Sequence, residues 1–180
     1  WWGVYWKGDK IGYAVTKQES RDGKIWVKEN LWLKLTLLGT PQNIEQTLEY
    51  RMDESLTLEF FQFSLQSGLF PFHLAGQMED RPAGPGKRLR LMVSSGGKDQ
   101  VQVMDLSESP YLLGQTKLYL LAQGLEKGKR YRIPAFDPST LHPAEMIAEV
   151  EGMDSLNVGG EERELYRVRQ EFRGIVVKSW

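Results

Sequence analysis

Cysteine is absent from the 180-residue chain, and its absence removes whole classes of chemistry. Without thiols, the chain has no disulfide, no thiolate zinc site and no cysteine nucleophile. Histidine is scarce: His73 and His142 are the two in the sequence, and they are not spaced as a zinc-binding pair. An excess of one charge is also lacking, since 23 Lys and Arg oppose 24 Asp and Glu. A net charge of -1 gives no general reason to expect nucleic acid or an anionic membrane as a partner.

Long hydrophobic runs are missing too. The longest uncharged stretch, Phe60–Met78, contains glutamine, serine, proline and histidine, so it is too polar for a membrane-spanning segment. Hydrophobic residues nevertheless make up 41% of the chain and aromatic residues 11%, which is enough for a substantial core. The length suits one domain, so we expect a single β-rich domain over residues 1–180.

Alternation of apolar and polar residues is the main pattern in the first half of the chain. From Lys24 to Leu38 apolar residues occupy nearly every second position, which is typical of a long antiparallel strand with one buried face. Glu29 interrupts this apolar series. Short turn sequences such as Gly8-Asp9-Lys10 and Gly159-Gly160 separate the strand-like runs, which return after residue 128. The pattern predicts a mainly β chain of about eleven strands.

Residues 110–123 have a different period and predict one helix. Ser109 and Pro110 suit its start, and Gly124 suits its end. Because a large antiparallel sheet must curl or cover its face, we expect a large curved antiparallel sheet or half-barrel with this helix covering its concave side.

No catalytic set is evident in the sequence. A G-x-S-x-G nucleophile motif is absent. His73 lies in a strand-like run, where a histidine that is solvated or bonded to a neighbouring strand is the usual case. His142 precedes Pro143 in a loop-like segment. We therefore expect no enzyme activity, no cofactor and no metal site in this chain, although an unrecognised hydrolase site stays a minor alternative.

Aromatic residues gather at the N-terminus and again between Phe60 and Phe72, a stretch that includes Phe70. They suit a core, an apolar cavity for a lipid chain, or a docking surface for another protein, and these alternatives stay open. If there is a ligand surface, we expect six residues to line it: Trp32, Phe61, Phe63, Leu113, Tyr119 and Leu121.

Two segments carry a resemblance to a known family. Trp2–Tyr13 (WGVYWKGDKIGY) and Gly124–Pro138 (GLEKGKRYRIPAFDP) resemble the β-rich domain that precedes the transglutaminase-like module in bacterial exported proteins. Ser109–Leu112 and Phe63–Gly68 also fit that pattern. Within the second segment we expect Pro134, Asp137 and Pro138 to fix a loop, with Asp137 bonding nearby backbone N–H groups.

The resemblance implies a non-catalytic accessory or binding domain, of otherwise uncharacterised function, in the periplasm or cell envelope. Its partner would be the neighbouring transglutaminase-like module or another envelope protein. The family's Cys-His-Asp residues belong to that downstream module, so none is assigned here. The chain stops at Trp180 within an apolar strand-like run, and we expect it to be excised from a longer protein. The alternative function is a carrier or sensor of a lipid or other apolar ligand in a curved-sheet cavity, with the helix as a lid.

Overall fold

Strands form most of this protein. The computed structural model describes residues 1–37, 39–67, 70–82 and 84–180. The chain divides into two compact units, Trp1–Ser109 and Pro110–Trp180. The expected single domain over residues 1–180 stays a prediction, because two compact units do not decide whether they fold independently. Leu38, Gly68, Leu69 and Ala83 lie outside the described residues, as do the side chains of Leu37 and Phe70.

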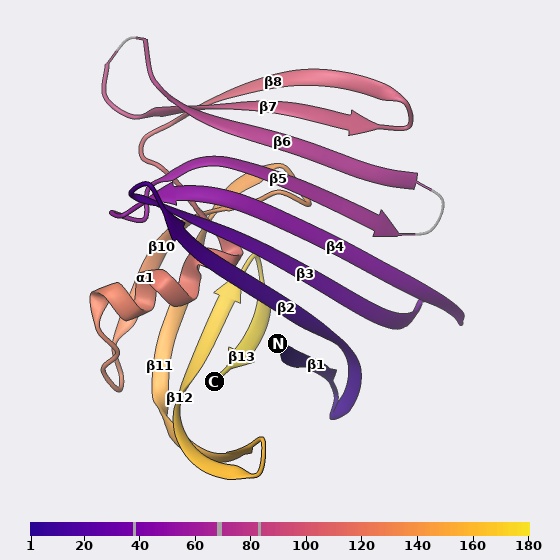
Figure 1. Ribbon diagram of the computed structural model, residues 1–180, viewed down its shortest axis with the longest axis vertical. Coiled ribbons are helices and arrows are strands. Elements are labelled where there is room, and N and C mark those ends of the chain that lie inside the picture. The colour runs from indigo at the N-terminus through magenta and orange to yellow at the C-terminus, as the bar shows by residue number, and fades with distance from the viewer. Residues whose placement is uncertain (38, 68–69, 83) are drawn as a thin grey trace. The chain divides into compact units, whose positions relative to one another are not determined.

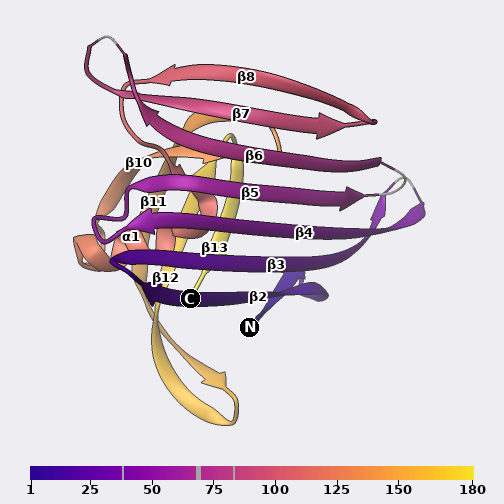
Figure 2. The ribbon, with the colours of Figure 1, turned by 45° about the horizontal axis from the view of Figure 1, so that its top comes forward.

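The first unit is one open antiparallel sheet in which each strand pairs with the next along the chain. Figures 1 and 2 show the strands in sequence order across a twisted, curved sheet. The strands are β1 (Trp2–Trp6), β2 (Asp9–Arg21), β3 (Lys24–Leu37), β4 (Thr40–Asp53), β5 (Leu58–Ser67), β6 (Phe70–Asp80), β7 (Lys87–Ser95) and β8 (Lys98–Leu106).

The strand register gives this sheet two chemically different faces, because cross-strand partners share a face and side chains alternate along each strand. One row of partners, on what we call the apolar face, consists of Val27, Tyr50, Phe61, Gly76 and Leu91. The adjacent row, on what we call the polar face, consists of Lys28, Glu49, Gln62, Ala75 and Met92. The first row is buried, whereas most of the second is partly or fully exposed.

Close backbone approach explains two glycines of this sheet. A Cβ at Gly12 would lie 2.0 Å from the carbonyl oxygen of Trp32, and a Cβ at Gly76 would lie 2.1 Å from the Phe61 ring. Neither distance is possible between non-bonded atoms. The need for glycine at position 76 follows only from the strand register, because the register places Phe61 opposite Gly76.

The second unit is a five-stranded sheet with one helical segment among its residues. Its strand order is β13-β12-β11-β10-β9. The elements are β9 (Tyr111–Leu112), the 3-10 helix η1 (Leu113–Gln115), α1 (Thr116–Gln123), β10 (Arg130–Asp137), β11 (His142–Val158), β12 (Glu161–Phe172) and β13 (Ile175–Ser179).

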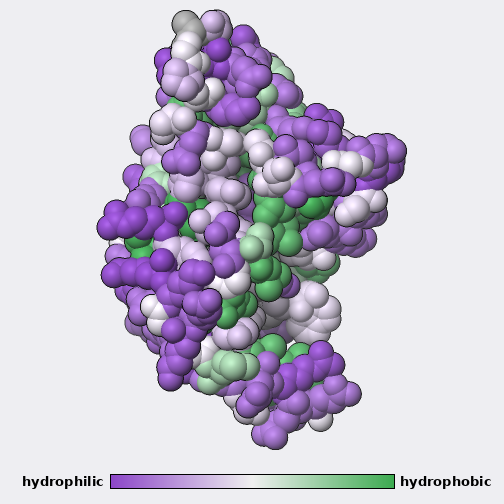
Figure 3. All heavy atoms as spheres, turned by 90° about the vertical axis from the view of Figure 1, so that its left-hand side faces the viewer, coloured by the Kyte–Doolittle hydropathy of each residue, from purple (hydrophilic) through white to green (hydrophobic). Residues whose placement is uncertain are grey.

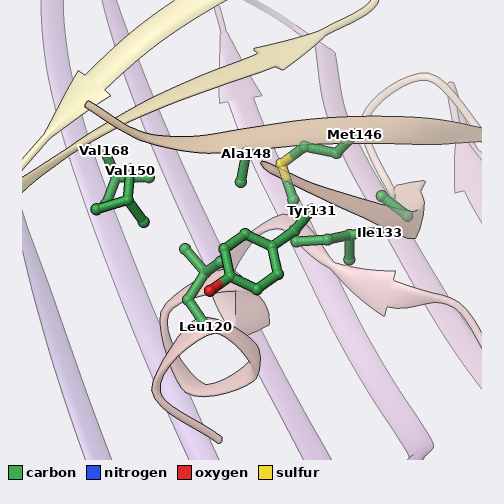
Figure 4. Close-up of a cluster of buried hydrophobic side chains, with 8 residues drawn as sticks. Leu120, Tyr131, Ile133, Met146, Ala148, Val150 and Val168 are labelled. Atoms are coloured by element: carbon green, nitrogen blue, oxygen red, sulfur yellow. The ribbon is translucent and has the colours of Figure 1, made fainter. Parts of the chain in front are cut away.

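The helix α1 covers one face of this five-stranded sheet. Leu120 points from the helix toward Tyr131 and Ile133 of β10 and joins a buried cluster with side chains of β11 and β12 (Figure 4). The Tyr131 hydroxyl also donates a hydrogen bond to the carbonyl of Gly124, directly after the helix. The loop that follows the helix is thereby tied to the sheet.

The fold class is confirmed: the chain is mainly β, its sheets are almost wholly antiparallel and open, and one helical segment is present. Thirteen strands occur in the described residues, where about eleven were expected. They form two sheets, of eight and five strands, where one large sheet was expected. The apolar pattern that identifies a strand contains no information on which strands share a sheet.

The start of the helix was predicted wrongly. Residues 111–112 are extended and pair in parallel with Ala135 and Phe136 of β10, and the α-helix begins at Thr116. Ser109 therefore does not cap the helix. Gly124 does end it, with φ of 80° and its N–H bonded to the carbonyl of Leu121. The apolar Tyr111 and Leu112 fit either structure, and their pairing with β10 is a tertiary contact.

Hydrophilic side chains cover most of the surface seen in Figure 3, and hydrophobic ones gather in smaller patches. None of the helices in the described residues has the length and hydropathy needed to cross a bilayer.

Candidate functional site

A shallow open groove of about 400 Å³ crosses the polar face of the eight-stranded sheet. It lies over β4, β5, β6 and β7, and its lining includes Thr47, Gln62, Ser64, His73, Met92 and Ser94. Small side chains form the groove where Ser64, Ala75 and Ser94 are flanked by larger ones. All of its lining residues belong to the first unit.

A row of polar side chains runs through the groove at right angles to the strands. In register from β3 to β8 it consists of Asn30, Thr47, Ser64, His73, Ser94 and Asp99. The two ends of the row are hydrogen-bonded internally: the Thr47 hydroxyl donates to Asn30 Oδ1 at 3.1 Å, and the Ser94 hydroxyl donates to Asp99 Oδ1 at 2.6 Å. Its centre, Ser64 and His73, makes no side-chain hydrogen bond within the described residues.

Charges beside the groove are compensated. Lys28 Nζ lies 2.5 Å from Glu49 Oε1 on the neighbouring strand. Farther along the same face, Arg90 pairs with Glu79 at 3.1 Å and Arg88 pairs with Asp105 at 2.8 Å. The hydrogen bond from Arg88 is the main cause that lowers the pKa of Asp105. The groove therefore offers polar groups without a strong field of either sign.

The groove has the residue types of a serine hydrolase but not the required arrangement. A Ser-His-Asp relay needs the serine to donate to the histidine and the histidine to donate to the carboxylate. Here the Ser94 hydroxyl donates directly to Asp99, and His73 bonds to neither. In the described part of the chain, no group of three or more His, Asp or Glu is placed to hold a metal ion.

Aromatic side chains of β2 and β3 stand beside the groove, on the same polar face of the sheet. Tyr13 and Trp32 stack with ring centroids 4.8 Å apart and an angle of 22° between the planes. The Arg51 guanidinium lies over the Trp26 ring, with its central carbon Cζ 5.2 Å from the ring centroid. Trp26 is 39% exposed. The register places Trp32 two strands away from Ser64 and two residues farther along the strand direction, which corresponds to roughly 12 Å.

The six residues predicted to line a ligand surface are divided between the two units, and the three in the first unit lie on two opposite faces of its sheet. Trp32 lies on the polar face, beside Glu45 of β4. Phe61 and Phe63 lie on the opposite, apolar face, where they are 0% and 3% exposed. The sequence pattern did not distinguish these faces, because Trp32 and the two phenylalanines belong to different strands whose relative register was unknown.

The other three predicted residues belong to the second unit. Leu113 and Leu121 are 38% and 55% exposed. Tyr119 packs edge-on against Tyr111 and Tyr131, with ring centroids 5.0 and 6.3 Å away. The tyrosine thus contributes to packing between the helix and its sheet, whereas the two leucines point outward.

The groove residues Gln62, Ser64 and Ser94 were not predicted from the sequence, and His73 was expected to be solvated or bonded to a neighbouring strand. Its side chain is exposed. The sequence does contain a signal for the groove, because all four residues occupy polar positions in strands whose residues alternate between polar and apolar. They come together only when the three strands β5, β6 and β7 are placed in register, and the sequence between these strands did not fix that register.

A second titratable site lies on the apolar face. Glu29 of β3 stands between Val27 and Leu31, and the Tyr50 hydroxyl donates a hydrogen bond to its Oε1 at 3.4 Å. Burial raises the pKa of Glu29 above its ordinary value of 4.5, and the hydrogen bond from Tyr50 offsets part of this rise. Burial and the nearby carboxylate raise the pKa of Tyr50 as well. Glu29 is the residue that interrupted the apolar alternation of the sequence.

Comparisons with other proteins add no relative from which a function could be transferred. Neither a family model, nor a curated protein, nor a solved structure matches this chain.

Proposed function

We propose that this chain is a non-catalytic binding module that acts beside a transglutaminase-like module of a periplasmic or cell-envelope protein. Its recognition surface is the groove on the polar face of β4–β7. In this role the module binds and positions a ligand or partner, and the chemistry belongs to the neighbouring module.

The groove itself is the observation that carries the proposal. Gln62, Ser64 and His73 present hydrogen-bonding groups to solvent, and no side-chain hydrogen bond engages them within the described residues. Polar groups held on a rigid sheet and left free are suited to recognition. Ser94 donates to Asp99 and not to His73, so the described groove lacks the Ser-His pair of a triad hydrolase, which supports binding over hydrolysis.

The neighbouring module and the cell-envelope setting are supported by the resemblance of Trp2–Tyr13 and Gly124–Pro138 to the domain that precedes transglutaminase-like modules. The second of these segments begins directly after α1 and includes β10 and the start of the following loop. It lies in the second unit, apart in sequence from the groove residues.

An affinity experiment tests the proposal. The purified chain and the double variant Gln62→Ala/His73→Ala would each be immobilised and exposed to fractionated cell-envelope peptides, glycans and lipids, and the retained species would be identified by mass spectrometry. We expect a species that the native chain retains and the double variant does not.

Equal retention of every species by both proteins would show that the groove is not the recognition surface. Conversion of a retained species by the purified chain would overturn the non-catalytic role. Both side chains are exposed, so the variant is expected to fold, and its circular dichroism and unfolding temperature serve as the check.

A further inference from the structure

The chemistry of the groove narrows the class of ligand, provided that the groove is the recognition surface proposed above. No lysine or arginine is among its described lining residues, and its one carboxylate, Glu49, is paired with Lys28. The arginines farther along the face are engaged by Glu79 and Asp105. Phosphate-bearing ligands, nucleic acids among them, need free cationic groups, so this face does not suit them.

The groups that are free can both donate and accept. The Gln62 amide offers two N–H donors and a carbonyl acceptor, the Ser64 hydroxyl does both, and a neutral His73 ring has one donor and one acceptor. Their mixed capacity matches a ligand rich in hydroxyl or amide groups. A purely apolar ligand would leave these groups without partners, at a cost in binding free energy.

An extended peptide is disfavoured by the position of the groove in the sheet. Strands β4, β5, β6 and β7 each pair with a neighbour on both sides, so their backbone N–H and C=O groups are engaged in the ladders. Peptides that bind sheets usually do so by adding a strand at a free edge. Recognition here has to come from side chains alone.

Apolar surfaces flank the polar centre. Met92 in the groove is 53% exposed, and Tyr13, on the same face of β2, is 43% exposed. Within the Tyr13–Trp32 stack, Trp32 is the nearer residue and stands roughly 12 Å from Ser64, from the strand spacing and the rise per residue. Sugar rings combine hydroxyl edges with C–H faces that pack on aromatic rings, so a chain of several sugar units presents both kinds of group at such a spacing.

The openness of the groove also favours a chain over a small compact molecule. Sites for small molecules usually enclose most of the ligand, whereas this groove is shallow and runs across the surface of a sheet. We therefore propose that the groove on β4–β7 binds a neutral oligosaccharide, with Gln62 and His73 hydrogen-bonding one sugar unit and the Tyr13–Trp32 stack packing against another unit farther along the same oligosaccharide.

The test is a titration of the ¹⁵N-labelled chain with chitotetraose and, separately, with cellotetraose, followed by amide chemical shifts and by tryptophan fluorescence. We expect saturable shifts confined to the groove strands and to Tyr13 and Trp32 with at least one of these sugars. Gln62→Ala and His73→Ala should each weaken binding about fivefold, the loss that one hydrogen bond accounts for. The matched control Gln100→Ala alters an exposed glutamine of β8 on the opposite face and should bind like the native chain.

Three outcomes would overturn the proposal: no saturable shift with either sugar, shifts confined to other strands, or unchanged affinity in both groove variants. Tighter binding of a sulfated tetrasaccharide of the heparin type would also overturn it, because the groove would then select negative charge. If neither neutral sugar binds while the affinity experiment still yields a peptide or protein that depends on Gln62 and His73, the binding module stands and the oligosaccharide falls.

Discussion

At the scale of a single residue, Glu29 makes the free energy of unfolding depend on pH. It lies on the apolar face of the eight-stranded sheet, where Thr16 and Leu48 are its cross-strand partners and the Tyr50 hydroxyl is its hydrogen-bond donor. Burial raises its pKa, so the folded state holds the Glu29 proton more tightly than the unfolded state does.

The sign of the effect on stability follows from this pKa. Below the ordinary value of 4.5 the carboxyl is neutral in both states and costs nothing. As pH rises above 4.5 the unfolded state loses this proton first, and the free energy of unfolding falls until the pH passes the raised folded pKa, where the carboxyl is charged in both states.

We predict that Glu29→Gln raises the free energy of unfolding above the folded pKa of Glu29 and changes it little at pH values below 4.5. Urea unfolding of both proteins over roughly pH 3.5 to 8, a range that begins below the ordinary pKa of a glutamate, gives the difference at each pH. The difference cancels the contribution of other carboxylates, such as Asp105, whose pKa is lowered by Arg88. A difference that is constant with pH would contradict the prediction.

At the scale of an element, the loop between β10 and β11 is organised by one side chain. Asp137 Oδ1 accepts hydrogen bonds from the backbone N–H of Ser139 at 2.9 Å and from its hydroxyl at 2.7 Å. Asp137 Oδ2 accepts another from the Thr140 hydroxyl at 3.0 Å. The expected bond from backbone N–H to Asp137 is thereby confirmed, and Leu141 completes the turn with a positive φ of 58°.

We predict that Asp137→Ala lowers the free energy of unfolding by about 1–2 kcal/mol, because three hydrogen bonds that hold the turn are lost. Asp137→Asn is the matched control, since its one remaining side-chain oxygen can still accept the Ser139 N–H, and it should lose less. Chemical unfolding of the three proteins gives the order. Equal stability of the alanine variant and the native chain would show that the turn is fixed by its backbone alone.

At the scale of the whole molecule, net charge and exposed apolar groups act together on association. The isoelectric point calculated from the sequence is about 6.2, and large apolar side chains such as Trp1 and Ile175 are 84% and 67% exposed. When the net charge is zero, electrostatic repulsion between molecules no longer opposes association through such groups.

We predict a solubility minimum near pH 6.2, measured by static light scattering across the pH range. The variant Lys98→Glu replaces an exposed cation at the start of β8 and should move the minimum to lower pH. Solubility that falls steadily with pH, or a minimum that does not move in the variant, would contradict a charge origin.

Local chemistry made the elements of this protein predictable. Alternation identified the long β3, and the Gly-Asp and Gly-Gly pairs identified hairpin turns, because strands and tight turns are specified by neighbouring residues. The helical segment was found for the same reason. Its start was misplaced because Tyr111 and Leu112 pair with β10, whose residues lie more than twenty positions later.

The sequence by itself determined a mainly β chain, the lack of thiol chemistry, a balanced charge and the turn built on Asp137. Only the tertiary structure decided that the strands form two sheets, that Trp32 and Phe61 lie on opposite faces, and that Gln62 and His73 meet in one groove. The physical reason is that a one-residue shift in register moves a side chain to the other face of a sheet. Register is set by all the pairings of the sheet together, so no single stretch of sequence contains it.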